Sequence, residues 1–324
     1  MAILVTGGAG YIGSHTVLEL VNRNEEVIVL DNLEYGHKEA VPNGKLIVGD
    51  LKNKNFVEKV FKENDIEAVI HFAAYASVAE SMSNPLRYYE NNVSGTINLL
   101  NAMKNNGVSK IIFSSTAAVY YGDKSVPLNE DDLKLPKNVY GKTKLDVENI
   151  LESTRVAYGI NYVVLRYFNA SGAHESGLIG EAHKDETHLI PIVLQVALGE
   201  REKINIYGDD YKTKDGTCIR DYIHVSDLAD AHILALERLR NGGDSGIYNL
   251  GNGEGFSVKE VVDKAIKVTG IDIKSEIVER RAGDGDYLVA SSKKAREELG
   301  WKPKYTKLED IIATAWKWHK NKRY

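Results

Sequence analysis

A glycine-rich loop near the start of the chain constrains the fold more than any other feature. Residues 2–6 form a short apolar run, residues 7–13 read Gly-Gly-Ala-Gly-Tyr-Ile-Gly, and apolar residues then recur at helical spacing over 16–21. Glycines at these places permit a tight turn, let the backbone approach a pyrophosphate and seat the helix closely on the strand. The pattern predicts a strand, a phosphate-binding loop and a helix whose N-terminus faces an anion.

An acidic residue follows the next apolar run. Residues 26–30 lead into Asp31, and an acid about twenty residues beyond such a loop bonds both ribose hydroxyls and repels a 2′-phosphate. This spacing favours NAD over NADP as the cofactor. The alternative is a glycine turn of another α/β protein, with Asp31 serving only as a cap.

Strand-like and helix-like segments continue to alternate through the first half of the chain. Strands are expected at 45–48, 68–74, 110–113 and 159–168, and helices at 56–63, at 85–105 and from Tyr140 onwards. This alternation predicts an α/β fold, a doubly wound parallel (Rossmann) sheet. We expect an NAD-binding domain over 1–170, joined by about 223–252, and a smaller α/β substrate domain mainly over 171–324.

Polar residues stand where several of these elements end. Residues 114–116 read Ser-Ser-Thr at the carboxyl end of a buried strand, where doubly wound sheets bind ligands. His71 ends another strand, and we expect it to be packed or bonded to backbone rather than catalytic. Asn91 and Asn92 fit a surface position or a contact with the cofactor equally well.

A tyrosine and a lysine stand four positions apart at Tyr140 and Lys144. On a helix their Cβ atoms would lie about 5–6 Å apart on one face. An ammonium about 4 Å from a phenol, at an effective dielectric of ~20, is worth roughly 4 kcal/mol and would lower the tyrosine pKa by up to roughly three units. The pair therefore predicts a phenolate base, although chance spacing would mean only two packed stems.

Composition excludes several classes of function. The 41 basic and 46 acidic residues give a net charge of -5, which argues against nucleic-acid or membrane-surface binding. A single cysteine, Cys218, excludes an intramolecular disulfide, and neither a signal-peptide core nor an 18-residue apolar run is present. We expect a cytoplasmic protein. The nine histidines lack a spacing such as H-E-x-x-H, so no metal site is predicted.

Taken together, the glycine loop, Asp31, the Ser-Ser-Thr of 114–116 and Tyr140-x-x-x-Lys144 resemble the extended short-chain dehydrogenase/reductase superfamily. Within it, the chain is similar to the UDP-glucose 4-epimerase (UDP-galactose 4-epimerase) family, most closely over 88–96, 166–173, 215–225 and 280–284. The likeness extends from the first strand to about Trp318.

The resemblance implies roles for particular residues. Tyr140 matches the catalytic base, Lys144 the lysine that lowers its pKa, and Thr116 the hydroxyl between tyrosine and sugar. The positions that match NAD contacts are Gly7, Gly10, Tyr11, Ile12, Gly13, Asp31, Asn32, Asp50, Leu51, Phe72, Ala73, Asn91, Ser114, Tyr140, Lys144 and Tyr167. The positions that match UDP-sugar contacts are Thr116, Asn169, His188, Leu189, Tyr207, Arg220, Arg281 and Asp284.

The implied enzyme is an isomerase of galactose and carbohydrate metabolism with tightly bound NAD. It would interconvert UDP-glucose and UDP-galactose through a 4-keto intermediate, as a homodimer whose bundle uses the helices after Pro85 and around Tyr140. The apolar stripes of those helices would equally suit packing within one chain. If Leu288 aligns with the residue that faces the sugar's 2-substituent, N-acetylated UDP-hexosamines are accepted too, whereas a slip to Tyr287 reverses that inference.

Other functions share part of this pattern. A nucleotide-sugar 4,6-dehydratase carries an Asp-Glu pair beside the strand-end threonine, where this chain has Ala117 and Ala118. A UDP-uronate 4-epimerase or another nucleotide-sugar enzyme of the superfamily, and an inactive NAD-binding sensor, stay open. The chain departs from the family in an additional tyrosine at Tyr121, in Val139 where relatives have proline, and in Ala76 where one branch has an NAD-contacting lysine.

Overall fold

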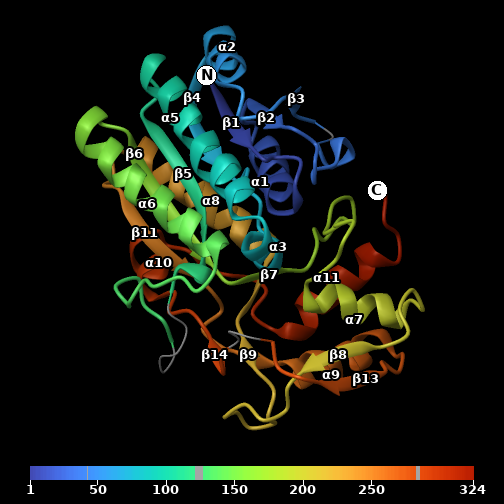
Figure 1. Cartoon of the computed structure of the whole chain (residues 1–324). Helices are drawn as coiled ribbons and strands as arrows, with labels where there is room; N and C mark the ends of the chain where they lie inside the picture. Colours follow the sequence, from blue (N-terminus) through green and yellow to red (C-terminus); the bar gives the residue numbers. More distant parts are fainter. Residues whose placement is uncertain (42, 121–126, 282–284) are drawn as a thin grey trace.

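A computed structural model of the chain describes residues 1–41, 43–120, 127–281 and 285–324 (Figure 1). The strands are β1 Ala2–Thr6, β2 Val27–Asp31, β3 Lys45–Val48, β4 Ile66–His71, β5 Lys110–Thr116, β6 Asn161–Tyr167, β7 Asn169–Ser171, β8 Ile204–Tyr207, β9 Ile219–Arg220, β10 Tyr222–His224, β11 Gly246–Leu250, β12 Phe256–Ser257, β13 Ser275–Val278 and β14 Tyr287–Leu288. The helices are α1 Tyr11–Asn22, α2 Lys54–Glu63, α3 Val78–Ser83, α4 Pro85–Tyr88, α5 Gly95–Asn105, α6 Val139–Tyr158, α7 Leu189–Ala197, α8 Val225–Arg240, α9 Val258–Thr269, α10 Lys293–Glu298 and α11 Leu308–His319, with short turns η1 Lys38–Ala40, η2 Tyr89–Ser94 and η3 Ala117–Val119.

The main sheet contains seven strands in the order β11-β6-β5-β4-β1-β2-β3. Every pairing within it is parallel. The chain builds β2 and β3 on one side of β1 and then crosses to build β4, β5 and β6 on the other. The order therefore reverses between β1 and β4, and ligands of such sheets bind at the carboxyl ends of the strands there. The predicted doubly wound α/β fold is confirmed.

Side-chain alternation along the strands explains why both faces of the sheet are covered. In β1, Ile3 and Val5 join a buried cluster with α1 and α8, while Leu4 joins a second cluster with α2, α5 and α6. Figure 1 shows these two layers of helices on either side of the sheet. Strands that are buried on both faces must be apolar at nearly every position, and β1 is.

The helix predicted over 85–105 is not one helix. It is divided into α4, the π-helical turn η2 and α5. Within η2 the side chain of Asn92 is buried, accepts a hydrogen bond from the Tyr75 backbone N–H at 2.8 Å and donates to Thr143 of α6 at 3.1 Å. The wider turn points this polar side chain inward, a common cause of an irregular helix turn.

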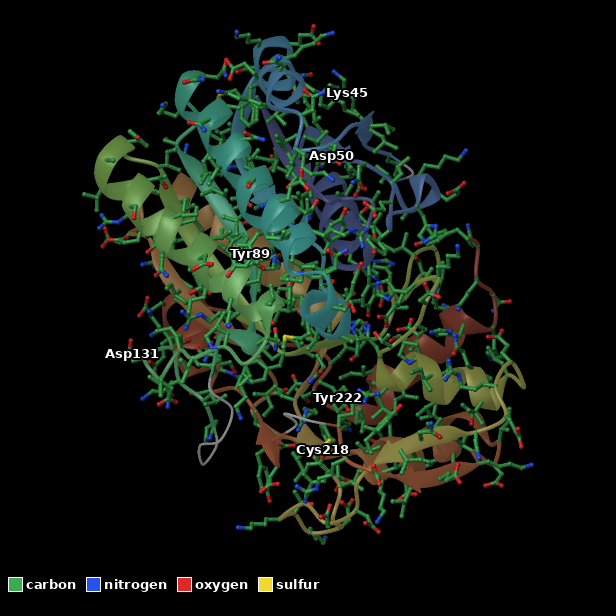
Figure 2. All side chains as sticks on the ribbon, in the orientation of Figure 1. Lys45, Asp50, Tyr89, Asp131, Cys218 and Tyr222 are labelled. Atoms are coloured by element: carbon green, nitrogen blue, oxygen red, sulfur yellow. The ribbon has the colours of Figure 1, made fainter. Side chains whose placement is uncertain are left out.

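The apolar stripe predicted along that helix does not all face the core. Leu86 is 79% exposed and Ile97 is 41% exposed, whereas Leu100 is buried. Tyr89, which is labelled in Figure 2, lies in η2 between α4 and α5, and its side chain is partly exposed. These large apolar side chains are therefore exposed on the surface of the chain.

A smaller lobe lies at the carboxyl end of the main sheet (Figure 1). Its core is a buried cluster of α7, α9, α11 and β8, and β13 pairs with β8 in parallel. Short strands β9, β12 and β14 form a separate sheet, and Figure 2 shows Cys218 and Tyr222 on this side of the molecule.

Helix α8 packs on α1, and β11 pairs with β6, so these later elements lie with the main sheet. Among the described residues, no helix has the length and apolarity needed to cross a membrane.

Candidate functional site

The glycine loop connects β1 to α1 at the point where the strand order reverses. Gly7 has φ +72°, and a Cβ there would lie 2.5 Å from the backbone nitrogen of Ala73. A Cβ on Gly13 would overlap the carbonyl of Gly7. Glycine is needed at both places, because the loop lies against the end of β4, where Phe72 and Ala73 donate to the Thr6 carbonyl at 2.9 and 3.1 Å.

The first turn of α1 is suited to a bound anion. Among the described residues, no side chain caps Gly10 and no acidic residue lies in the first turn of α1. The positive end of the helix dipole is thus uncompensated where the loop brings backbone close. Tyr11 points towards the second lobe and donates to the Gly172 carbonyl at 2.6 Å. The loop accordingly fits a pyrophosphate.

Asp31 ends β2 beside the loop. Its carboxylate accepts backbone hydrogen bonds from Ala9 at 3.0 Å and Leu33 at 2.9 Å, and burial raises its pKa. Each carboxylate oxygen keeps a further acceptor site, so this cap does not prevent a contact with ribose hydroxyls. Asn32 donates to Asp50 at 3.3 Å near the end of β3 (Figure 2), and Leu51 is buried.

The start of α6 brings Tyr140 to Thr116. The side chain of Asn138 caps the helix by accepting from the Gly141 N–H at 2.8 Å. Gly141 lies so close to Ala118 that a Cβ would overlap the Ala118 carbonyl. This close approach brings the phenol of Tyr140 near the hydroxyl of Thr116, which lowers the phenol pKa in part. A strand end and a helix start, far apart in sequence, thus form one polar site.

Lys144 lies one turn further along α6 and is 4% exposed. Its ammonium donates to the Ser114 carbonyl at 2.7 Å and lies 4.7 Å from the centre of the Phe113 ring. Burial lowers the pKa of Lys144 to about 7, while the charge of Glu148 opposes that shift.

The predicted lowering of the Tyr140 pKa by Lys144 is not found. Burial raises the pKa of Tyr140 to about 12, and the nearby Thr116 hydroxyl lowers it by less. The ammonium of Lys144 is directed at the Ser114 carbonyl, and the loss of water around the phenol outweighs the other influences on its pKa.

Two of the predicted NAD contacts, Ser114 and Tyr167, lie near this site on the neighbouring strands β5 and β6. The hydroxyl of Ser114 lies 2.9 Å from Nε2 of His232, and the phenol of Tyr167 lies near Ser114. His71 is packed as expected, although its partners are the hydroxyls of Thr6 at 2.6 Å and Thr96 at 2.8 Å rather than backbone groups. Asn91 donates a hydrogen bond to Asn92 at 3.0 Å, and Asn92 is the buried member of this pair.

Sequence reasoning missed a buried ion pair beneath the tyrosine and lysine. Glu148 of α6 and Arg166 of β6 form two hydrogen bonds, of 3.0 and 2.6 Å, and both side chains are almost fully buried. Ser115 donates to the same carboxylate at 2.5 Å, and Arg166 also donates to Tyr120 at 2.8 Å. The signal available in sequence was the position of Glu148, four residues after Lys144 on the same helix face.

The second lobe carries most of the candidate substrate contacts. Asn169 donates to the Asp221 carbonyl at 2.8 Å, which joins β7 to the turn between β9 and β10. Arg220 donates to the Gly285 carbonyl at 3.0 Å. The guanidinium of Arg281 lies 3.8 Å over the ring of Tyr207 and covers one of its faces. Asp284, like Tyr121, lies outside the described residues.

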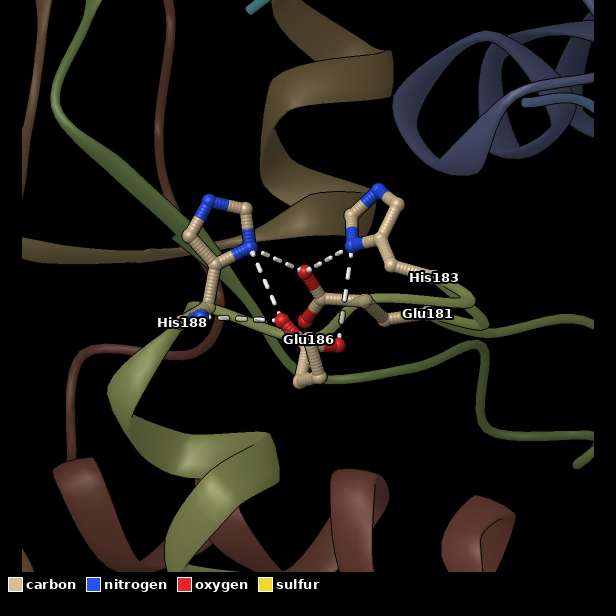
Figure 3. Close-up of side chains that lie close together, drawn as sticks. All are labelled: Glu181, His183, Glu186 and His188. Atoms are coloured by element: carbon tan, nitrogen blue, oxygen red, sulfur yellow. Dashed lines mark hydrogen bonds and ion pairs between the residues drawn. The ribbon is translucent and has the colours of Figure 1, made fainter. Parts of the chain in front are cut away.

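His188 immediately precedes Leu189 at the start of α7, and its ring faces a pair of glutamates (Figure 3). Glu181, His183, Glu186 and His188 bring four ligand-type atoms within 4.8 Å of one another. Burial would lower the pKa of His183, but hydrogen bonds and charges of both glutamates raise it to about 10. Sequence analysis missed this cluster because Glu-x-His-x-x-Glu-x-His is not a familiar metal spacing.

Comparison with known proteins agrees with this geometry. The sequence model of the NAD dependent epimerase/dehydratase family matches residues 3–251. The UDP-glucose 4-epimerase of Halalkalibacterium halodurans is 56% identical over 320 residues, which are 99% of this chain and 96% of that protein.

Solved structures give the same result. The UDP-glucose 4-epimerase from Brucella ovis in complex with NAD has a TM-score of 0.95 and 45% identity, covering 97% of both chains. The enzyme from Bifidobacterium longum in complex with NAD+ and UDP has a TM-score of 0.93 and 42% identity, covering 99% of both chains. This chain therefore belongs to the NAD dependent epimerase/dehydratase family, among its UDP-glucose 4-epimerases.

Proposed function

We propose that this protein is an NAD-dependent isomerase that interconverts UDP-glucose and UDP-galactose by inversion at C4. The observation that carries the proposal is the meeting of Thr116, Tyr140 and Lys144 at the carboxyl end of the sheet, beside the glycine loop. A sensor without chemistry would have no use for a phenol and a hydroxyl in contact within a buried site. Ala117 and Ala118 offer no acid or base for a dehydration.

The cofactor would lie in the first lobe, which we define as 1–170 together with about 223–252. The glycine loop would hold the pyrophosphate, Asp31 the adenosine ribose, and Lys144 the nicotinamide ribose. The contact with ribose suits NAD, because the Asp31 carboxylate would repel a 2′-phosphate. When bound, NAD supplies the hydride acceptor and donor and, in its oxidised form, a positive charge.

Tyr140 would move one proton in each half of the reaction. Its phenolate takes the proton of the 4-hydroxyl as the alcohol becomes a ketone, and returns it when the alcohol re-forms. Thr116, whose hydroxyl lies near the phenol, would relay between tyrosine and sugar as the sugar turns. Bound NAD in its oxidised form would add a positive charge to that of Lys144 near the phenol, and both charges would favour deprotonation of Tyr140.

The substrate would be held mainly by its nucleotide, against 171–324. Arg220 and Arg281 would offer forked donors to a diphosphate, and the face of Tyr207 opposite Arg281 would suit a uracil ring. Firm binding of the diphosphate with few contacts to the hexose would let the keto sugar rotate and present its other face. His188 and Leu189, at the start of α7, would complete this side of the site.

We also propose that two copies associate through the helices around Leu86 and Val156. Leu86 is 79% exposed, Ile97 41% and Val156 73%, which is unusual for side chains of this size on neighbouring helices. Sedimentation equilibrium should give a dimer for the natural chain. Substituting Leu86→Lys together with Ile97→Lys should give a monomer, and a dimer of unchanged stability would count against this interface.

The function is tested by supplying the purified protein with UDP-galactose and measuring UDP-glucose, together with the nucleotide released on denaturation. We expect UDP-glucose to form without added cofactor and close to one NAD to be released per chain. Bound NAD without any epimerisation would favour the sensor. A product other than UDP-glucose would identify another nucleotide-sugar enzyme.

A further inference from the structure

Four side chains in the segment that leads into α7 converge on one point (Figure 3). His183 Nδ1 lies 3.2 Å from Glu181 Oε1 and 3.5 Å from Glu186 Oε2. His188 also presents Nδ1, which is bonded to Glu181 Oε1 and lies 3.6 Å from Glu186 Oε1. Both histidines thus direct the same ring nitrogen at the same two carboxylates, and the other nitrogen of each ring points away.

The spacing of these atoms suits a small cation. Zinc bonds to imidazole nitrogen and carboxylate oxygen at about 2.0–2.2 Å, so the edges of a tetrahedral site are about 3.4 Å long. The separations of 3.2, 3.5 and 3.6 Å between imidazole nitrogens and carboxylate oxygens are close to that edge. The contact between His188 Nδ1 and Glu181 Oε1 is shorter than that edge, and the four atoms lie within 4.8 Å of one another, so binding an ion would move these two side chains apart.

The charges also require a counter-ion. The side chains of Glu181 and Glu186 are 3% and 4% exposed, so two carboxylates are removed from water within one cluster. Two histidinium protons would balance them, but the two rings are then like charges with centres 5.4 Å apart. A divalent cation with two neutral imidazoles gives the same net charge without that repulsion.

The carboxylates are held in place by neighbouring groups. The backbone N–H groups of Thr187 and His188 donate to the Glu186 carboxylate at 2.8 and 2.9 Å, and the indole of Trp318 anchors the backbone of Glu181 by donating to its main-chain carbonyl at 2.8 Å. Such supporting bonds fix the orientation of metal ligands. His188 is 55% exposed, which leaves an entry path from solvent.

We propose that Glu181, His183, Glu186 and His188 form a binding site for a divalent transition-metal ion of the zinc class. Four protein ligands complete a tetrahedral shell, so the role of the ion is structural rather than hydrolytic. The site fixes the ring of His188 at the start of α7. The edge of the His183 ring contacts Tyr11 of the glycine loop, with centroids 6.5 Å apart at 88°, so the same ion orders the segment between the two lobes.

The test uses the full, untagged chain, freed of metal with a chelator and then separated from the chelator. Titration with Zn²⁺ in a calorimeter should show one ion bound per chain with micromolar affinity or better. It should also show release of protons that the imidazoles held, seen as a dependence of the heat on the ionisation enthalpy of the buffer. Mg²⁺, which prefers six oxygen ligands, should not compete. Absence of Zn²⁺ binding at micromolar concentrations would overturn the site.

Variants locate the ion. His183→Gln and Glu186→Gln, each checked for folding by circular dichroism, should weaken binding about tenfold to a hundredfold or more. The matched control is His174→Gln, because His174 is a nearby histidine whose Nδ1 pairs with Ser176 outside the cluster. Equal affinity in His183→Gln and the natural chain would place the ion elsewhere. X-ray absorption should detect only nitrogen and oxygen ligands, and a sulfur ligand would indicate Cys218 and refute the assignment.

Discussion

The catalytic side and the substrate side of the site are built differently. Thr116, Tyr140 and Lys144 lie on a seven-residue strand and a twenty-residue helix that pack against each other. Tyr207, Arg220 and Arg281 lie at the ends of short strands or between them. In the proposed reaction, chemistry therefore depends on regular elements of one lobe, whereas recognition of the nucleotide depends on the irregular parts of the other.

The difference has a physical cause. A proton transfer fails when the groups are displaced by about an ångström, so its residues benefit from buried and rigid supports. Glu148 and Arg166 provide such a support beneath α6. A flexible diphosphate, in contrast, is bound by forked donors that adapt to it, and a sugar that must turn over needs a tolerant pocket.

Removing the phenol should have the largest effect. We expect Tyr140→Phe to lower turnover about 10²–10⁴-fold, because a general base is lost, while the amount of bound NAD stays the same. Tyr158→Phe, on the exposed end of the same helix, serves as the control and should be fully active. Turnover is measured with UDP-galactose, and bound nucleotide by absorbance after denaturation. Unchanged turnover in Tyr140→Phe would show that the phenol of Tyr140 is not the catalytic base.

Breaking the ion pair beneath α6 should destabilise the catalytic lobe strongly. Arg166→Met leaves Glu148 buried without a counter-charge, which costs about 3–5 kcal/mol of the free energy of unfolding. Replacing both residues with apolar ones, Arg166→Met with Glu148→Leu, should recover much of that loss. Urea unfolding measures each variant. A loss below ~1 kcal/mol in the single variant would show that this support contributes little.

Acid should destabilise the fold by several kcal/mol between pH 6.5 and about 4.5. Burial lowers the pKa of His15, His71 and His224 to about 3, and of His232 and His319 to about 4. The unfolded chain therefore binds protons at these residues first, and stability falls as the pH falls below the unfolded value. The pKa values of His183 and His188 are raised, so protonation of these two residues stabilises the fold. That stabilisation is lost at higher pH than the window above, as the pH rises.

The pH effect is measured by urea unfolding at several pH values. The variant His319→Gln should reduce the slope by about one proton, equal to ~1.4 kcal/mol per pH unit. A free energy of unfolding that stays constant from pH 6.5 to 4.5 would contradict the neutral state of these imidazoles.

Two adjacent arginines provide a test of the substrate side. Arg281 lies over Tyr207, whereas Arg280 lies over Tyr211 and pairs with Asp210. We expect Arg281→Ala to weaken UDP binding about 10–100-fold, the value of one or two charged hydrogen bonds, and Arg280→Ala to change it less than twofold. Calorimetry with UDP compares them. Equal losses would mean that charge in general, and not the position of Arg281, attracts the nucleotide.

The smallest effect concerns the first residue of α6. Val139 follows the cap Asn138, whose φ of -129° and ψ of 162° suit a residue that precedes proline. Because proline fits the first helical position, Val139→Pro should stabilise the fold by about 0.4–1 kcal/mol without affecting turnover. Urea unfolding and the epimerase assay check both parts. A destabilised variant would mean that the start of α6 is strained by its contact with Ala118.

Sequence was most informative where signals are local. The glycine loop, Asp31 at the end of β2 and the alternating strands follow from spacing within a few residues, and they led to the correct sheet and cofactor class. The break at η2 was not foreseen, because the partners of Asn92 lie on other elements.

Contacts between distant segments could not be predicted in the same way. The pairing of Glu148 with Arg166, and the carbonyl that receives Lys144, depend on how β5, β6 and α6 meet. Burial also reversed the direction of the Tyr140 pKa shift, because the sequence gives spacing along a helix but not the loss of water around it. The cluster of Glu181 with its neighbours was overlooked for want of a known spacing.

The central claim is that Tyr140 moves only the proton of the 4-hydroxyl, while the hydrogen on C4 returns to the same sugar. Epimerisation of UDP-galactose in D₂O tests it directly, with the deuterium content at C4 of the UDP-glucose product read by NMR. We predict no deuterium at C4, because the C4 hydrogen never exchanges with solvent. Incorporation of solvent deuterium at C4 would mean that a base removes the C–H proton, and would contradict the account.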